Sequence, residues 1–448
     1  MKLSKIEVTN FRCFESLTLP LHPEVNVLGG ANGAGKTSLL DAIATSLWDV
    51  VAANGSASQR RRDNQRASLH ASDIHVVPGS DSSETGRKDF VQFRTTAGDV
   101  YNAGHLEWTD FIQYRPPNGF HYDQQGTRPV HDYFQELWQE IKRTDSKALI
   151  PLPVVAYYRA DRRFSQMPNM GNIFELELAR TGAYDNALNA GANFQAMCQW
   201  FYLRENAELR QKVQFTQDRD FVFNDLQAVR KALMIGLEGV ERIFFDDNPP
   251  TLKASFARRH GVTETLELAQ LSDGYRNLLA LVLDFARRLA QAHPHWPEPL
   301  TAPGILLIDE IELHLHPRWQ QTVIPNLRKV FPNTQIIVST HSPQVLTSIH
   351  EESIRILKDR KLFSAPTRSY GAESQRMLKS VLETEARPPE NENAIDLTVI
   401  FRQINAGQYD EAKRGIASLQ ERMGQDEPAL IEALTLIENR QWEKELGL

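Results

Sequence analysis

The chain has 448 residues, with 50 lysines and arginines against 57 aspartates and glutamates, and a formal net charge of −7. This balance excludes a protein whose whole surface is basic and coats nucleic acid, while a local basic face stays compatible with it. Two cysteines, Cys13 and Cys198, are too few for a disulfide framework or a four-cysteine zinc site. No apolar run approaches the roughly 18 residues of a membrane helix, and Glu7 precedes any apolar stretch. We therefore expect a cytoplasmic protein with no membrane span and no signal peptide.

The first candidate site is a glycine-rich turn between a strand and a helix. Val25 and Val27 belong to an expected strand, and apolar residues at helical spacing follow over residues 37–50. Between them, residues 30–37 read GANGAGKT and match G-x-x-x-x-G-K-[ST] at every fixed position. Such glycines let backbone N–H groups surround phosphate oxygens at the positive end of a helix. We expect Lys36 to reach the β- and γ-phosphates and Thr37 to bind Mg²⁺, so ATP and Mg²⁺ are the predicted cofactors.

The middle of the chain changes character after Arg115-Pro116-Pro117-Asn118-Gly119, which predicts a break. Phe90–Tyr101 before it alternates as a strand does. Residues from about 130 to 233 have a helical pattern, which the apolar stretch Leu152–Tyr158 interrupts. Two further segments, Val240–Phe245 and Leu252–Phe256, are expected to pair as strands.

A basic run, Arg60-Arg61-Arg62, lies in a polar segment of the first part of the chain. It could contact a phosphate backbone, but a solvated loop is the favoured interpretation.

A second part of the site follows an apolar strand, Gly304–Ile308, which ends at Asp309 and Glu310. A second apolar strand, Gln335–Val338, follows after a helix. Two such strands with a helix between them predict a buried parallel sheet. Carboxylates at the end of such a strand are placed to serve a phosphate site. We expect Asp309 to hold the Mg²⁺ shell and Glu310 to polarise the attacking water as general base.

Three other segments resemble motifs of ABC-type ATPases. Leu271–Tyr275 resembles the ABC signature, with Asp273 and Tyr275 departing from its commonest form, and Ser272 or Asp273 is also a natural helix cap. Ser339–Pro343 resembles the switch segment, in which His341 contacts the γ-phosphate. Glu312–Pro317 resembles the D-loop along a dimer interface, and its paired histidines leave a metal site as the less favoured alternative.

In this order the motifs resemble those of the SMC, RecF and OLD group of ABC-type ATPases. Ile6–Phe14 is similar to the first strand of that group, in which the arginine, here Arg12, lies near the nucleotide. The resemblance implies an α/β P-loop ABC-type ATPase head, with a mixed or parallel sheet and helices, a helical insertion and a helical C-terminal region. Two glutamines, Gln92 and Gln113, are both candidates for the Q-loop. The expected catalytic residues are Glu310 and His341, the metal ligands are Thr37 and Asp309, and the nucleotide contacts are Arg12, Gly30, Asn32, Gly33, Gly35, Lys36, Thr37, Ser38, Ser272, Asp273 and Gly274.

A narrower resemblance, to the ATPases of Septu and retron anti-phage systems, covers more of the chain. It implies a homodimer or higher oligomer joined through the ATP sites, an effector protein such as an HNH nuclease, and DNA or a retron RNA–DNA as nucleic acid. No Asp-x-Asp follows His341, so no intrinsic nuclease of the TOPRIM kind is expected. The segments that carry the resemblance are Val154–Arg159, Arg180–Tyr184, Trp200–Phe201, Tyr370–Leu378 and Ile404–Gln408 with Ala412.

This resemblance implies an ATP-hydrolysing subunit of a defence complex that senses or gates nucleic acid and controls a separate nuclease. The alternative is a RecF-like repair ATPase that clamps DNA without an effector. The expected domains are ATPase lobe I (1–115), a helical insertion (116–235), ATPase lobe II (236–355) and a helical docking region (356–448).

Overall fold

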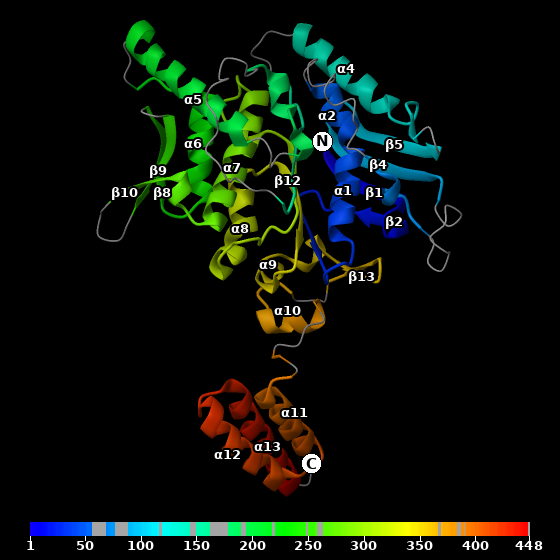
Figure 1. The fold of residues 1–448 in the computed structure, drawn as a ribbon, viewed down its shortest axis with the longest axis vertical. Helices are drawn as coiled ribbons and strands as arrows, with labels where there is room; N and C mark the ends of the chain where they lie inside the picture. The colour runs from blue at the N-terminus through cyan, green and yellow to red at the C-terminus, as the bar shows by residue number, and fades with distance from the viewer. Residues whose placement is uncertain are drawn as a thin grey trace. The chain divides into compact units, whose positions relative to one another are not determined.

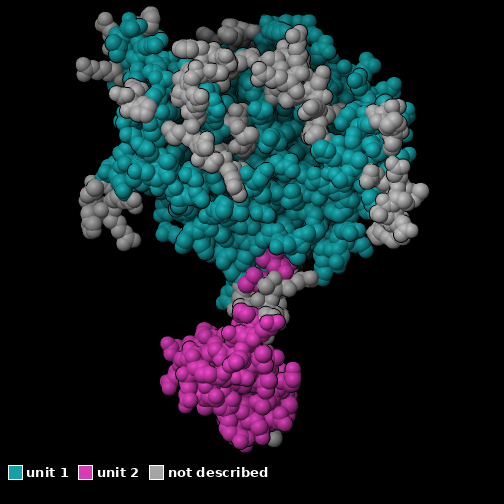
Figure 2. Space-filling model, in the orientation of Figure 1, with its two compact units in different colours: residues 1–377 teal, residues 378–448 magenta. Residues whose placement is uncertain are grey.

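A computed structural model describes two compact units, residues 1–377 and residues 378–448 (Figure 2). The run Arg60–Arg62 lies outside the described residues, so its expected exposure stays a prediction. The described residues are 1–55, 69–76, 88–115, 119–143, 149–161, 178–189, 194–216, 220–247, 250–257, 263–365, 369–382, 387–388 and 390–446.

The expected nucleotide motifs follow strands of a six-stranded sheet in the first unit, with the order β14-β13-β3-β12-β11-β7. Every pair in it is parallel except β13 and β14. β3, β7, β11 and β12 are buried along their whole length, which explains why they are unbroken apolar runs. The parallel pairing confirms the buried sheet expected from Gly304–Ile308. The strands are β3 (Val25–Gly29), β7 (Val154–Tyr158), β11 (Gly304–Ile308), β12 (Thr334–Thr340), β13 (Ile354–Lys358) and β14 (Lys361–Ser364).

Helices cover this sheet, and β12 lies between α1 and α7 in Figure 1. α1 (Lys36–Ser46) follows β3 directly, and α7 (Asp273–Ala292) is a long helix with an almost completely buried second half. The other helices of this unit are α2 (Trp48–Asn54), α4 (Arg128–Arg143), α5 (Phe194–Arg210), α6 (Asn224–Gly236), α8 (Pro317–Val330), α9 (Pro343–Thr347) and α10 (Ser374–Ser380). Single turns are η1 (Ala71–Asp73), η4 (Arg180–Tyr184), η6 (Gln211–Thr216), η7 (Leu268–Gln270), η8 (Pro299–Thr301) and η9 (Glu351–Ser353).

Two antiparallel sheets complete the first unit. The pairing of Phe245 with Leu252 confirms the expected hairpin, to which β10 adds a third strand. The larger sheet has the order β2-β1-β4-β5-β6, and its β4 confirms the strand expected from residue 90 onward. The strands are β1 (Lys2–Phe11), β2 (Phe14–Pro20), β4 (Phe90–Val100), β5 (Gly104–Arg115), β6 (Gly119–Asp123), β8 (Val240–Asp247), β9 (Pro250–Ala257) and β10 (Thr263–Glu267).

The observed units differ from the expected domains at three places. β6 pairs with β5, so one sheet continues across the boundary expected at residue 115. β7 belongs to the parallel sheet although it lies inside the expected helical insertion. β13 pairs with β3 and β14 with β13, and the first unit therefore extends to Met377 rather than ending at residue 355. These differences arise because strand pairing depends on distant partners that local composition does not reveal.

The second unit is a three-helix bundle of α11 (Glu392–Asn405), α12 (Tyr409–Met423) and α13 (Pro428–Leu446). Gly407 and Gly424 take positive φ angles of 76° and 97° after α11 and α12, a conformation that glycine adopts readily where a helix ends. The bundle has its own core, formed by Leu397, Ile400, Ile404, Ala412, Ile416, Leu419, Leu430, Ala433 and Ile437. Among the described helices of both units, none combines the length and apolarity needed to cross a bilayer.

Candidate nucleotide-binding site

The turn between β3 and α1 depends on two glycines that other backbone approaches closely. Gly30 has a φ of 147°, and a Cβ there would lie 2.3 Å from the Leu357 carbonyl oxygen on β13. Gly35 has a φ of 104°, and a Cβ there would meet Cys13 Sγ and Phe14 Cζ, each at 2.8 Å. The phosphate loop is therefore held between the β1–β2 turn and the β13–β14 hairpin, segments that are distant in sequence.

The side chain of Lys36 is held over this turn. Its Nζ donates hydrogen bonds to the carbonyl oxygens of Gly30 and Ala31, each at 2.9 Å. Burial lowers the pKa of Lys36 to about 8, although the carboxylates of Glu312, Asp309 and Glu310 oppose the shift. The Lys36 ammonium group thus lies over the carbonyl groups of the turn, with three acidic side chains nearby.

Thr37 and Asp309 meet although 272 positions separate them in the chain. The Thr37 hydroxyl lies 2.9 Å from Asp309 Oδ2 and 3.2 Å from Oδ1. Ser339, on the intervening strand β12, donates to Asp309 Oδ1 at 2.5 Å. A hydroxyl and a carboxylate at this separation are hard oxygen donors of the kind that Mg²⁺ prefers, so the residues present fit that ion.

Glu310 follows Asp309 with a strained backbone, because its φ is 47°. Its N–H donates to Ser339 Oγ at 2.8 Å, so one serine hydroxyl holds both residues of the acidic pair. Sequence reasoning named Ser339 only as part of the switch segment. The pairing of β11 with β12 is what gives it this second role.

The expected switch residue, His341, lies beside Lys36. Its Nδ1 is 3.4 Å from Lys36 Nζ. Burial and then the Lys36 charge lower the pKa of His341, which favours a neutral imidazole near pH 7. Glu312 fixes this segment by accepting from the His341 N–H at 2.5 Å and from the Thr340 hydroxyl at 2.7 Å. No sequence pattern indicates this role of Glu312, which belongs to the expected D-loop.

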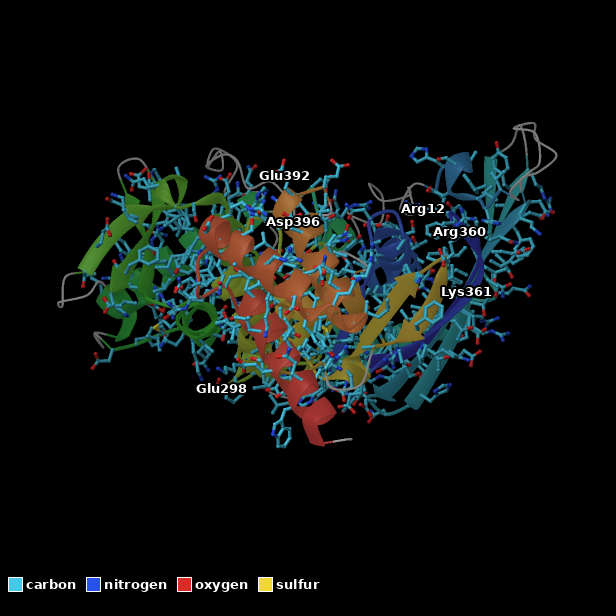
Figure 3. The ribbon with its side chains drawn as sticks, turned by 90° about the horizontal axis from the view of Figure 1, so that it is seen from below. Arg12, Glu298, Arg360, Lys361, Glu392 and Asp396 are labelled. Carbon is cyan, nitrogen blue, oxygen red and sulfur yellow. The ribbon has the colours of Figure 1, made fainter. Side chains whose placement is uncertain are left out.

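Arg12 makes two ion pairs with acidic side chains rather than with the phosphate loop. Its guanidinium lies 2.6 Å from Asp41 on α1 and 2.8 Å from Asp73. Asp41 also accepts from the Tyr157 hydroxyl at 2.9 Å and from Arg159 at 3.2 Å. These groups line a cavity of about 480 Å³ beside α1. Figure 3 labels Arg12 together with Arg360 and Lys361 of the β13–β14 hairpin. Burial raises the pKa of the Cys13 thiol, and the charges of Arg360 and Arg12 oppose this shift.

The expected signature begins α7 and contacts the expected D-loop. Ser272 occupies the N-cap position without a side-chain cap hydrogen bond. A Cβ on Gly274 would lie 2.0 Å from the His314 carbonyl oxygen, so only glycine allows this approach. Tyr275, which departs from the commonest signature, is buried and packs edge-on against Phe256 and Trp319 at 5.5 and 5.0 Å. Asp273 is exposed and pairs with Arg276 on its own helix.

One of the paired histidines has a structural role. His316 is the N-cap of α8, and its ring accepts a hydrogen bond from the Arg318 N–H at 3.3 Å. Within the described ranges, no group of three His, Cys, Asp or Glu side chains could hold a metal ion.

Neither glutamine considered for the Q-loop lies at the carboxyl edge of the parallel sheet. Gln92 is on β4 and Gln113 on β5, both in the antiparallel sheet. The strand next to β11 is β7, which ends at Tyr158 and is followed by Arg159. The backbone of Tyr158 accepts from the Asp309 N–H at 2.9 Å, so this segment lies beside the acidic pair, on the side opposite β12.

The structure therefore brings together Lys36, Thr37, Asp309, Glu310 and His341 around one turn. Asn32 and Gly33 are exposed at that turn, and Ser38 is half-buried at the start of α1. Gly274 of the expected signature instead approaches the backbone of His314 and Leu315. This arrangement can bind a phosphate chain with a divalent ion on one side and a carboxylate-held water on the other.

Two families match this sequence. The family described as "AAA domain, putative AbiEii toxin, Type IV TA system" matches residues 114–347, and the family described as "AAA ATPase domain" matches residues 1–52.

Known relatives include ATPases of retrons and a Septu protein. The chain is 28% identical to the Retron Ec83 probable ATPase of Escherichia coli, over 99% of this chain and 88% of that relative. It is 35% identical to the Retron Vc95 probable ATPase of Vibrio cholerae serotype O1 biovar El Tor, over 38% of this chain and 33% of that relative. It is 36% identical to Septu protein PtuA of Bacillus mycoides, over 21% of this chain and 13% of that relative.

Two solved structures are similar in fold at low sequence identity. The SmcHead bound to the C-winged helix domain of ScpA gives a TM-score of 0.44 at 15% identity, covering 81% of this chain and 98% of that one. The SMC head domain from Thermotoga maritima gives 0.42 at 14% identity, covering 82% of this chain and 100% of that one.

Proposed function

Because this chain belongs to the AAA-domain family that matches residues 114–347, we propose that it hydrolyses ATP as the ATPase subunit of an anti-phage defence complex. The approach of Thr37 to Asp309 at 2.9 Å is the observation that carries the ATPase part of the proposal. It joins the phosphate loop to the acidic pair, which a chance glycine turn would not do. The similarity to retron and Septu proteins supports the defence context.

Each residue of the site has a defined task in this reaction. Lys36 binds the β- and γ-phosphates, and Thr37 with Asp309 holds Mg²⁺, which neutralises phosphate charge when bound. Glu310 orients a water molecule toward the γ-phosphorus and accepts its proton as the new P–O bond forms and the bond to ADP breaks. His341 donates a hydrogen bond to a γ-phosphate oxygen, which a neutral imidazole can do. Ser339 and Glu312 keep Glu310 and His341 in place.

Two substitutions separate binding from turnover. Lys36→Ala should lose nucleotide affinity because it removes the charge opposite the phosphates. Glu310→Gln should bind ATP normally and turn over at least about a hundredfold more slowly, because only the proton acceptor changes. Titration calorimetry and phosphate release would measure the two effects. Lys329→Ala on α8 and Glu136→Gln on α4 are exposed controls of the same kind. Parental hydrolysis by Glu310→Gln would show that the general base is assigned wrongly.

We also propose that two copies share each ATP, with Lys36 and Glu310 from one and Ser272 and Gly274 from the other. The support is that Ser272 is the N-cap of α7 and makes no side-chain cap hydrogen bond, and that the positive N-terminal end of a helix favours an anion. ATP with Mg²⁺ should then dimerise Glu310→Gln, which retains its nucleotide. Sedimentation with ATP and with ADP would test this. An unchanged mass at saturating ATP would count against the shared site.

The second unit is the proposed docking site for a separate effector, for which we propose an HNH-type nuclease. Residues 378–448 carry eight lysines and arginines against fourteen aspartates and glutamates, and Glu392 and Asp396 lie one turn apart on α11 (Figure 3). An acidic bundle favours a protein partner over direct contact with DNA or a retron RNA–DNA. The native complex should therefore contain a nuclease subunit, while the purified chain alone should not cut DNA. Recovery of the chain on DNA without any effector would favour the RecF-like alternative.

A further inference from the structure

Two consecutive tyrosines end β7, and each bonds to a buried aspartate on a different helix. The Tyr157 hydroxyl donates to Asp41 Oδ1 at 2.9 Å, and the Tyr158 hydroxyl donates to Asp284 Oδ2 at 2.8 Å. Asp41 lies in the middle of α1, the helix of the phosphate loop, and Asp284 lies in the middle of α7, the helix of the expected signature.

The strand geometry explains why neighbours in sequence reach different helices. Successive side chains of a strand point to opposite faces of its sheet. Tyr157 therefore reaches the face covered by α1, and Tyr158 reaches the face covered by α7. Both rings are fully buried, with 1% and 0% of their surface exposed.

Both aspartates are fixed by arginines as well as by the tyrosines. Asp41 accepts from Arg12 and Arg159, and Asp284 lies 2.8 Å from Arg287 and from Arg288. Burial and the adjacent carboxylate raise the pKa of each phenol, so each hydroxyl stays protonated and donates. Loss of one hydroxyl would leave each carboxylate with its charged partners, and the fold should survive.

The same dipeptide also touches the acidic pair. The carbonyl oxygen of Tyr158 accepts the Asp309 N–H at 2.9 Å, and β7 runs beside β11 in register up to Tyr158 and Ile308. The dipeptide thus contacts α1, α7 and the backbone of Asp309.

We propose that Tyr157 and Tyr158 are positioning residues that fix the phosphate-loop helix α1 relative to the signature helix α7. This inference rests on the proposed ATPase function and deepens it. The two hydroxyl bonds act in series, because either one alone leaves α1 and α7 unconnected through β7. Their task is to bring the α7 N-terminus to its working position when the phosphate loop binds ATP. They contribute little to ATP binding itself, since neither hydroxyl contacts the phosphate loop.

The test uses Tyr157→Phe, Tyr158→Phe and the double variant in the full chain. Each single variant should lower kcat roughly tenfold, as expected for one bond to a charged group, with an ATP dissociation constant within about twofold of the parent. The double variant should lose no more than the larger single loss, because the bonds act in series. Tyr184→Phe is the matched control: Tyr184 is also fully buried and its hydroxyl donates to the Pro153 carbonyl oxygen at 3.2 Å. It should keep the parental kcat.

Hydrogen exchange gives a second readout that does not need turnover. In a Glu310→Gln background, ATP with Mg²⁺ should protect residues 30–40 in all variants, and residues 272–280 only where both tyrosines are present. Additive losses of kcat, or a Tyr184→Phe loss equal to the others, would overturn the inference and leave the ATPase proposal standing. A parent chain that neither binds nor hydrolyses ATP would overturn both.

Discussion

His293 shows how one buried side chain can set the response of the ATPase unit to acid. It follows α7 and is fully buried. Its Nδ1–H donates to the Leu289 carbonyl oxygen at 2.9 Å, and its Nε2 accepts from the Leu152 N–H at 3.0 Å. The neutral ring therefore donates one hydrogen bond and accepts one, through its two nitrogens. Burial lowers the pKa of His293 to about 3.

This environment predicts a loss of stability in acid. The unfolded chain binds a proton at His293 below a pH of about 6.5, whereas the folded chain resists protonation until about pH 3. Stability from this group is therefore complete above about pH 6.5 and falls by about 1.4 kcal/mol for each pH unit below it. Urea titrations of the full chain from pH 7 to pH 4.5 would measure the slope.

Two variants assign the slope to the residue. His293→Gln should be less stable at pH 7 but should flatten the profile, because glutamine does not titrate. His295→Gln changes an exposed histidine two positions away and should keep the parental slope. A His293→Gln profile as steep as the parental one would place the effect elsewhere.

Single residues also show what a sequence can and cannot reveal about the site. Lys36, Thr37, Asp309 and Glu310 were predictable because motif spacing and strand ends place them. Their supporting partners were not. Glu312 acts through hydrogen bonds to residues 340 and 341, which depend on how two loops meet across β11 and β12.

At the scale of elements, α7 approaches the segment of residues 312–317 so closely at Gly274 that a side chain would not fit. A Cβ on Gly274 would lie 2.0 Å from the His314 carbonyl oxygen, which belongs to backbone and cannot turn aside as a side chain could. Gly274→Ala should therefore move the α7 N-terminus or this segment, at a cost of about 1–3 kcal/mol in stability.

The expected functional result is a loss of turnover with retained nucleotide binding. Gly274→Ala should lower kcat by roughly tenfold or more, because the signature and the expected D-loop no longer meet. ATP affinity of the undimerised chain should stay near parental, since Gly274 does not touch the phosphate loop of its own chain. Calorimetry and phosphate release would separate the two. Gly98→Ala, where a Cβ meets nothing within 4 Å, is the control. Parental turnover by Gly274→Ala would show that this contact is dispensable.

The elements that the sequence missed are those fixed by distant pairing. Leu152–Tyr158 was recognised as apolar but placed in a helical insertion, because a short apolar run does not distinguish a strand from a buried helix. Its partner strand β11 begins 150 positions later, at Gly304, which pairs with Val154. By contrast, β3 was predictable from the glycine turn that follows it, β11 from its acidic end and β12 from its apolar run.

At the scale of the whole molecule, the chain beyond the last nucleotide motif divides into two parts with different roles. β13 and β14 complete the six-stranded sheet, and the backbone of Leu357 lies close to Gly30 of the phosphate loop. Met377 is fully buried in the first unit, whereas the bundle of α11–α13 has its own core. Residues 356–448, the expected docking region, therefore contain strands that pair with the sheet of the first unit.

Truncation at two points tests this division. A chain ending at Leu382 keeps the first unit and all of α10, so it should be soluble and hydrolyse ATP within about twofold of the parental kcat. A chain ending at Arg360 loses β14 and leaves β13 as an open edge beside the phosphate-loop strand, so it should be insoluble or inactive. Soluble yield and phosphate release would compare them.

The chain ending at Leu382 should also fail to retain the effector that co-purifies with the full chain, because the acidic bundle is gone. Full activity in the chain ending at Arg360 would show that β14 is dispensable and that β13 alone supports the phosphate loop. Retention of the effector by the chain ending at Leu382 would place docking on the ATPase body instead.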